Sequence, residues 1–246
     1  MSGATISESR KEFSLSTQRY FSRSSVGIEV SRSEENDYEA DAILLSTEWD
    51  SDNNLSTLAL GLSYSKDKIT PTDAVLFGRV LEEKKSSRSF SLGWTQILDK
   101  TSVIQSGIRV TQHNGFLTDP YKLRDVRPDK RIEWSVNLRY RKFIERANAA
   151  LHTDYRYYDD SYEIHSHTFE TAWYQNIGGD FQLVPNLRYY SQRQASFYLP
   201  IDDYTLPATT HQSSDYRLST FGAFTVGLKA IYNQPTWAIS ASVEQY

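Results

Sequence analysis

The chain has 246 residues, a formal net charge of −4 and a mean hydropathy of −0.58. No run approaches the roughly 20 consecutive apolar residues that a transmembrane helix needs, which excludes a helical membrane protein. Cysteine is absent, which excludes disulfides and thiolate metal sites, and the basic residues are scattered among acids, which argues against a nucleic-acid partner.

Apolar and polar residues alternate along most of the chain, with the period of two that places successive side chains on opposite faces of a β-strand. Leu58, Leu60 and Leu62, for example, alternate with Ala59 and Gly61. No segment shows a sustained helical period. The alternation predicts about twelve strands, near residues 10–21, 24–33, 38–50, 55–65, 87–98, 103–114, 131–143, 148–158, 167–177, 180–197, 214–232 and 236–246.

The predicted connections between these strands alternate between two kinds. Short turns are expected near residues 22–23, 51–54, 99–101, 144–147, 178–179 and 233–235. Long loops are expected near residues 33–37, 66–86, 115–130, 159–166 and 198–213. This asymmetry is typical of outer-membrane β-barrels, whose periplasmic turns are short and whose outer loops are long.

Aromatic residues fall toward both ends of the predicted apolar face, as the two interfacial girdles of a membrane barrel require. Those near short turns are Trp49, Trp173 and Trp237, and those nearer the long loops are Tyr64, Trp134, Tyr157 and Tyr189. Alternation alone also fits a soluble lipocalin-like barrel, a sandwich or a propeller. Together with the turn asymmetry, however, the girdles favour a single all-β domain over residues 1–246: an antiparallel up-and-down transmembrane β-barrel in the bacterial outer membrane, in contact with the lipid bilayer.

The predicted topology also bears on completeness. Residues 1–4 are followed by polar residues and not by the basic and apolar segments of a signal peptide, so we expect that peptide to have been removed or to lie upstream. Both termini fall on the long-loop side, and the residues that precede Tyr246 in steps of two are Glu244, Ser242 and Ser240, which do not form an apolar ladder. We therefore expect a partial barrel that lacks strands at both ends.

Several specific runs make the chain similar to the domain-of-unknown-function family 3570. They are Gly115-Phe116-Leu117-Thr118-Asp119-Pro120-Tyr121-Lys122, Arg127-Pro128-Asp129-Lys130-Arg131, His152-Thr153-Asp154-Tyr155-Arg156-Tyr157-Tyr158, Ser166-His167-Thr168-Phe169-Glu170, Pro185-Asn186-Leu187-Arg188-Tyr189-Tyr190-Ser191-Gln192 and Ser214-Asp215-Tyr216-Arg217-Leu218-Ser219. The resemblance covers most of the chain and implies an outer-membrane β-barrel of Gram-negative bacteria with no established activity. Members are associated with an ApbE-like flavin transferase, a thioredoxin-like protein and a small lipoprotein, which implies a role in envelope redox or flavoprotein biology.

The densest group of candidate functional residues is a polar cluster predicted to face the lumen. His152, Asp154 and Arg156 alternate on one strand opposite Tyr155 and Tyr157. Neighbouring strands add further charged residues, namely Glu133, Arg139, Arg141, Glu170 and Arg188. Mixed charges in a barrel interior form a ladder of ion pairs in the simplest interpretation. The alternatives are selectivity for a charged solute and, more remotely, catalysis.

Two further segments invite a functional interpretation. His165 and His167 lie close to Asp159, Asp160 and Glu163, a combination that suits divalent transition metals. A polar loop that returns into a strand is the favoured explanation, however, and the spacing dictates no third ligand. We therefore assign no catalytic residue, metal or cofactor.

A long loop carries two prolines, which predicts an ordered excursion that is an ordinary turn, a constriction or a contact for a partner. Its residues of interest are Asp119, Pro120, Tyr121, Lys122, Arg127, Pro128 and Asp129. Pro185 falls inside a predicted strand, where it removes a backbone donor and implies a bulge or a local break in pairing.

These features support three hypotheses about function. The first is a non-enzymatic barrel that serves as a pore or as an export and anchoring partner in an envelope system. The second is a plugged barrel that docks a lipoprotein or a periplasmic redox partner. The third and most remote is an outer-membrane enzyme whose site is assembled across strands, since no Gly-x-Ser-x-Gly, His-Glu-x-x-His or phosphate-loop motif occurs.

Overall fold

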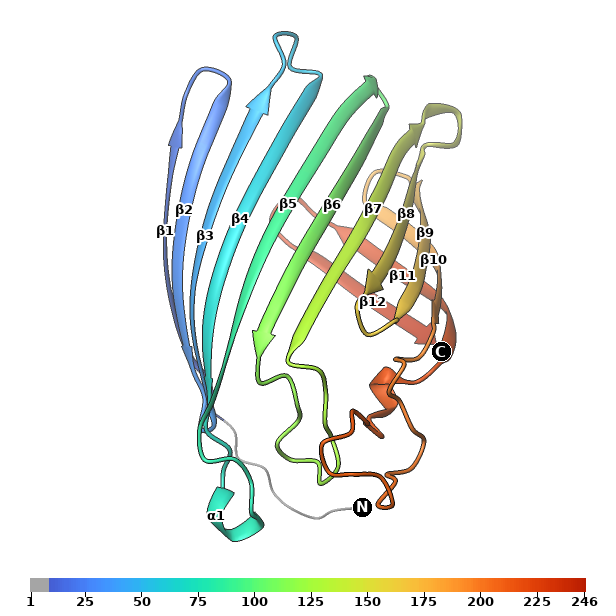
Figure 1. The fold of residues 1–246 in the computed structure, drawn as a ribbon. Helices are drawn as coiled ribbons and strands as arrows, with labels where there is room; N and C mark the ends of the chain where they lie inside the picture. Colours follow the sequence, from blue (N-terminus) through green and yellow to red (C-terminus); the bar gives the residue numbers. More distant parts are fainter. Residues whose placement is uncertain (1–8) are drawn as a thin grey trace.

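A computed structural model describes residues 9–246, and residues 1–4, on which the signal-peptide expectation rests, lie outside the described part. Twelve antiparallel strands form one sheet in which each strand pairs with its neighbours in sequence (Figure 1). This confirms the predicted all-β up-and-down architecture. The strands are β1 Lys11–Tyr20, β2 Ser24–Glu34, β3 Tyr38–Asp50, β4 Ser56–Ile69, β5 Glu83–Asp99, β6 Ser102–Gly115, β7 Lys130–Ile144, β8 Ala149–Asp160, β9 His165–Ile177, β10 Phe181–Gln192, β11 Phe221–Asn233 and β12 Ala238–Gln245.

The pairing register sorts the side chains onto two faces. Residues directly opposite each other in a sheet share a face, and the register joins Leu62 to Phe90, Phe90 to Val110 and Val110 to Trp134. This row is apolar, and Leu62 is 53% exposed and Phe90 42% exposed. An outward face of exposed apolar side chains on strands of this length is typical of sheets that contact lipid.

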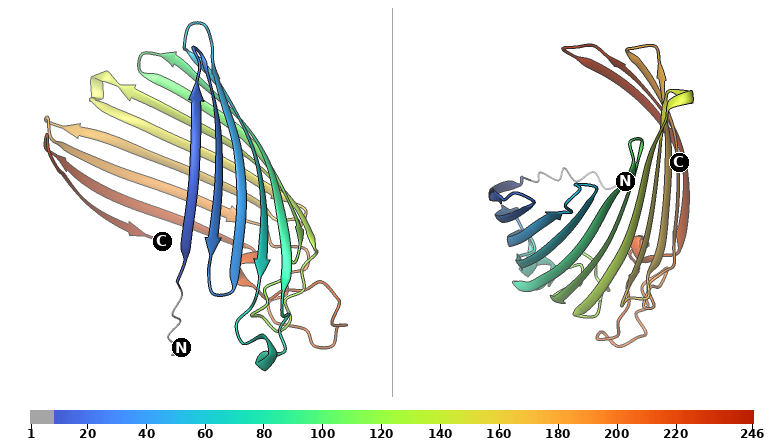
Figure 2. Two further views of the ribbon diagram at one scale, coloured as in Figure 1. Left: turned by 90° about the vertical axis from the view of Figure 1, so that its left-hand side faces the viewer. Right: turned by 90° about the horizontal axis from the view of Figure 1, so that it is seen from above.

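The alternate residues form the polar face, and this face is concave. Arg141 on β7 and Glu244 near the end of β12 line the same cavity although four strands lie between β7 and β12, which requires both side chains to lie inside the curve of the sheet. Figure 2 shows the curvature from two further directions. Within the described residues β1 pairs only with β2 and β12 only with β11, so the sheet is unclosed. Unpaired edges leave backbone donors and acceptors without partners.

The concave face is divided into two regions of different character. Across β2–β5 one row consists of Gly27, Ser46, Gly61 and Ser91, so that this part of the wall carries small side chains. Across β7–β10 the corresponding rows carry long charged side chains. The concave face therefore has one half lined by small side chains, on β2–β5, and one half lined by charged side chains, on β7–β10, here called the charged half.

Several connections differ from those predicted. The expected long loops at 33–37 and 159–166 are tight turns, because the strands on either side extend to Glu34 and Tyr38 and to Asp160 and His165. The Asp160 carboxylate closes the second turn by accepting hydrogen bonds from two backbone amides within it. The loop expected at 66–86 is confined to residues 70–82, which include the one-turn helix α1, Ala74–Phe77. The long-loop prediction was therefore right for three of the five connections.

Two strand predictions were wrong at their ends. Residues 193–197 and 214–220 were expected to be strand, but they belong to the connection between β10 and β11, which includes the short helix η2, Tyr216–Leu218. In that connection the Ala195 amide donates to the Leu218 carbonyl. Both side chains are buried, together with Tyr162 and Ile164, in a small apolar core. These segments leave the sheet because the alternative packing buries their apolar side chains against another loop.

The aromatic residues that were expected to form girdles lie on the outward face wherever the register covers them. Trp49 pairs with Leu58 near one short turn. At the other end the Trp134 ring lies 5.3 Å from that of Tyr157.

Pro185 is paired with Leu228 on β11, whereas pairing with β9 stops at Leu183 and resumes in the same register at Asn186. The predicted local break is confirmed, and it occurs without a bulge.

No helix in residues 9–246 is long and apolar enough to cross a membrane.

Candidate functional site

A row of four charged side chains crosses the charged half of the concave face. The register places Arg139 opposite Asp154, Asp154 opposite Glu170 and Glu170 opposite Arg188, so two acids on β8 and β9 stand between two arginines on β7 and β10. The Arg188 Nε lies 3.0 Å from Glu170 Oε1, and the Arg139 Nε lies 3.6 Å from Asp154 Oδ1. Because these side chains are about half exposed, each pair contributes about 0–1 kcal/mol, and the row matters for the charge pattern that it presents.

The remaining members of the predicted polar cluster lie on the same face but have different partners. Arg141 donates to both carboxylate oxygens of Asp154, at 2.8 and 2.9 Å. His152 packs against Tyr174, with 4.2 Å between the ring centroids. Arg156 has no hydrogen bond or ion pair to any described residue, and its guanidinium carbon lies 5.9 Å from the centroid of the Tyr158 ring.

Glu133 stands apart from this cluster, at the end of β7 nearest the loops. It accepts a 2.8 Å hydrogen bond from the Tyr158 hydroxyl and lies 3.4 Å from His113. Arg131 and Asp160, which the sequence did not assign to the polar cluster, complete this group: the Arg131 guanidinium donates to the fully buried Asp160 carboxylate at 2.5 Å. The structure therefore separates Glu133 from the charged row and joins it to a network at the base of the loops.

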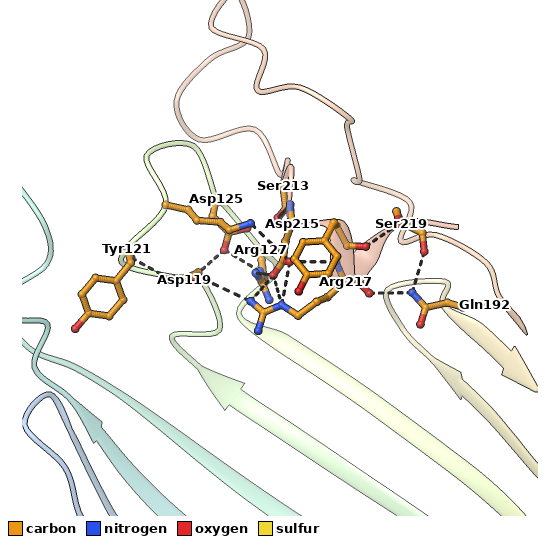
Figure 3. Close-up of polar contacts among 11 residues, drawn as sticks. Asp119, Tyr121, Asp125, Arg127, Gln192, Ser213, Asp215, Arg217 and Ser219 are labelled. Carbon is orange, nitrogen blue, oxygen red and sulfur yellow. Dashed lines mark hydrogen bonds and ion pairs between the residues drawn. The ribbon is translucent and has the colours of Figure 1, made fainter. Parts of the chain in front are cut away.

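A second group of polar residues, here called the loop hub, joins the loops to one another (Figure 3). It consists of Asp119, Asp125, Arg127, Asp215 and Arg217. Asp215, 1% exposed, accepts hydrogen bonds from Arg127 Nη2 at 3.1 Å and from Arg217 Nη2 at 2.6 Å. Arg127 Nε also donates to Asp125 at 2.8 Å. Two buried carboxylates and two guanidiniums thus hold the 116–129 loop against the 193–220 loop.

The electrostatic balance within the loop hub favours ionised Asp215. Burial raises the pKa of this carboxyl, but the hydrogen bonds and the charge of Arg217 outweigh burial and hold the pKa well below its usual range. The same hydrogen bond raises the pKa of Arg217, and burial only partly opposes this. The pair is therefore charged at neutral pH, with its carboxylate inside the protein and its guanidinium largely exposed.

Several predicted residues of the family-motif loop contact other parts of the loop end. The Tyr121 hydroxyl donates to Asp37, in the turn after β2, and its ring lies 4.7 Å from the Arg79 guanidinium. Lys122 Nζ lies 3.6 Å from Asp215. The Pro128 carbonyl accepts the Tyr162 hydroxyl at 2.9 Å.

The other motif residues fix the shape of the loop itself. Asp119 Oδ1 accepts the Tyr121 amide across Pro120, and the Asp129 carbonyl accepts the Gly115 amide at 2.8 Å. The loop is an ordered excursion that contacts several other loops. Sequence reasoning missed Asp125 and Asp215, and the only signal for Asp215 was its place in the Ser214-Asp215-Tyr216-Arg217 run.

His165 and His167 lie on the outward face. His165 contacts Asp159, while His167 Nδ1 lies 2.8 Å from the Tyr155 hydroxyl and its ring packs against Tyr157. In residues 9–246 no group of three or more His, Asp or Glu side chains is placed to hold a metal ion. The two histidines therefore lie among interfacial aromatic residues and away from the concave face.

Comparisons with known proteins agree with this architecture. The family model described as "Protein of unknown function (DUF3570)" matches residues 2–80 and 76–246. No curated protein matches the chain significantly. Among solved structures, the siderophore receptor PirA from Acinetobacter baumannii is 11% identical with a TM-score of 0.66, over 96% of this chain and 42% of the receptor.

Two other receptors are similar in the same way. The siderophore receptor PirA from Pseudomonas aeruginosa is 10% identical with a TM-score of 0.65, over 95% of this chain and 44% of that one. The ferric-catecholate import receptor Fiu from E. coli K12 is 8% identical with a TM-score of 0.61, over 96% and 52%. The chain thus spans about half the length of these receptors or less. At such identities the likeness shows the fold alone, a sheet of the outer-membrane β-barrel type.

Proposed function

The chain belongs to the DUF3570 family of proteins of unknown function, and we propose that it forms wall strands of an outer-membrane β-barrel that acts as a pore for polar solutes. The observation that carries this proposal is the separation of the two faces over all twelve strands. An apolar outward face suits lipid, and a concave face with small residues on one half and charged residues on the other suits water and dissolved solutes. No enzymatic role is assigned to the charged residues.

The orientation of the charged side chains supports a pore. The arginines and acids of the charged row lie on the concave side of the sheet and keep from one third to well over half of their side-chain surface exposed, so they stay hydrated. A ladder that closed the lumen would require these groups to be buried against a facing wall. Charged side chains that line an aqueous passage set its preference for cations or anions.

A second candidate function is a docking scaffold for a lipoprotein or a redox partner. The loop hub favours it, because loops held by buried ion pairs present a fixed surface at one end of the barrel. Apolar side chains are also exposed at the loop end of the sheet on α1, where Val75 is 86% exposed and Leu76 is 76% exposed (Figure 1). Exposed apolar groups on a rigid loop are typical of contact surfaces.

Planar-bilayer recordings of the full-length protein separate the two candidates. The pore predicts discrete conductance steps that persist in purified protein reconstituted without a partner. A protein that gives no conductance and co-purifies with a lipoprotein from the native envelope contradicts the pore and supports the scaffold. A preparation boiled in detergent, which unfolds the barrel, serves as the control for contaminating channels.

A further inference from the structure

A cavity of 430 Å³ lies where the charged half of the concave face meets the loop hub. Its lining contains five guanidinium groups, from Arg127, Arg131, Arg156, Arg188 and Arg217, and a single carboxylate, that of Asp215. The other lining residues include the hydroxyl side chains of Ser166 and Thr168. The inner surface of this cavity therefore presents mainly hydrogen-bond donors.

Four of these five arginines are neutralised by acids that lie behind or beside them. Arg131 is paired with buried Asp160 at 2.5 Å, and Arg188 with Glu170 at 3.0 Å. Arg127 and Arg217 share buried Asp215. Each guanidinium has five N–H donors, so pairing with one carboxylate leaves some of them free to bind another acceptor.

Arg156 is the arginine without an acid partner. The register places it between Asn137 on β7 and Thr168 on β9, and Thr168 is followed in the row by Tyr190, so its own row holds no carboxylate. The acids one row away are already engaged: Asp154 with Arg139 and Arg141, and Glu170 with Arg188. Its positive charge is therefore uncompensated by a contact within the described chain.

We propose that this cavity binds an oxyanion group, a phosphate or a carboxylate, of a small polar solute. Arg156 provides the principal contact through its guanidinium fork, which matches the geometry of two oxyanion oxygens. The Thr168 hydroxyl, directly opposite on β9, supplies a further donor. The neutralised arginines contribute free N–H groups without adding an equal excess of charge. Lipid headgroups have no access, because Arg156 lies on the concave face and Tyr155 and Tyr157 face outward.

This inference rests on the proposed function only in that the cavity lies inside the barrel. Binding can be measured without conduction, by calorimetric titration of the detergent-solubilised full-length protein with inorganic phosphate and, separately, with succinate at low ionic strength. Wild-type protein is expected to bind both. Arg156→Gln is expected to weaken binding about tenfold or more, because a hydrogen bond to a charged group is lost, while Arg156→Lys loses less because the charge remains.

Arg109→Gln is the matched control. Arg109 also lies exposed on the concave face without an ion pair to a described residue, but it is two strands away and lines a different cavity, with Gly61 and Ser91. The Arg109→Gln variant is expected to bind phosphate like the wild type. Failure of the wild type to bind either anion, or an equal loss in Arg109→Gln and Arg156→Gln, overturns the proposed site. Conduction without anion binding would contradict the anion site but not the pore. Anion binding without conduction would contradict the pore but not the anion site.

Discussion

The Arg127 guanidinium donates a 3.1 Å hydrogen bond to the Asp215 carboxylate across 88 residues of sequence. The two residues belong to different loops, and the backbones of these loops pair with each other only at the isolated bridge between Val126 and Gln212. This contact is the centre of the loop hub. It makes the loop end of the molecule a cohesive structure whose stability can be tested separately from that of the sheet.

Removing the Asp215 carboxylate should loosen the loop hub. Asp215→Ala removes the buried carboxylate that Arg127 and Arg217 share and leaves Arg127 paired with Asp125 alone. Breaking a buried ion pair costs up to about 3–5 kcal/mol. We expect faster proteolytic cleavage within residues 193–220 while the sheet keeps its β-type circular dichroism. Asp202→Asn, in the same loop at a side chain that forms no hydrogen bond or ion pair within residues 9–246, should be cleaved like the wild type. Equal cleavage of the two variants would contradict the role of the hub.

Acid should open the same loop within a defined pH range. Because the folded-state pKa of Asp215 is depressed, its ionised form stabilises the hub above the unfolded value of about 3.9, and this contribution is lost as pH falls through the lower folded value. The chain has no cysteine, so Ile201→Cys provides a unique, exposed attachment point for a fluorophore. Fluorescence anisotropy should be constant from neutral pH to about pH 4 and fall below it. A decrease centred near pH 6 would assign the transition to another group.

Gly115 should not tolerate a side chain. Its φ is +112°, and a Cβ there would lie 2.3 Å from the Lys84 carbonyl oxygen, which is backbone and cannot move aside locally. Gly115→Ala is therefore expected to destabilise the loop end of β6 by about 1–3 kcal/mol, measured by urea unfolding in detergent. Gly179→Ala, where a Cβ meets nothing within 4 Å, is the control and should unfold like the wild type.

The ion selectivity of the pore should respond to Asp154. Asp154→Asn removes the acid shared by Arg139 and Arg141, leaving two guanidiniums uncompensated in the lumen. The reversal potential in a salt gradient should shift toward greater anion selectivity. Asp52→Asn alters an exposed short turn outside the charged half and should leave selectivity unchanged. An identical shift in both variants would show that Asp154 does not face the conducting path.

The sequence was most informative where side-chain direction follows from strand geometry. Asp154 and Tyr155 are adjacent, yet the register sends one to Glu170 and the other to Phe169, as alternation requires. It was least informative in the loops. Residues 214–220 alternate like a strand, but the Asp215 carboxylate accepts the Arg217 amide and caps a short 3-10 turn. Such local hydrogen bonds compete with strand pairing.

The candidate sites also differ in how far the sequence could predict them. The charged row and the location of Arg156 follow from strands of known direction, so the sequence could place their members on one face. The pairing of Arg127 with Asp215 depends on how two long loops cross, which no periodicity encodes. The sequence could not show that Arg156 lacks an acid partner either, because that depends on which neighbours Asp154 and Glu170 have already engaged.

The contacts of the family-motif loop also have a mechanical consequence. Through Tyr121 it is tied to Asp37, beside β2 and β3, and through Arg127 to Asp215, ahead of β11. The hairpin ends between these two points cannot spread or draw together independently, since a change in spacing at one would stretch contacts at the others. A force or ligand that moves this single loop would therefore change the spacing of all these hairpin ends together.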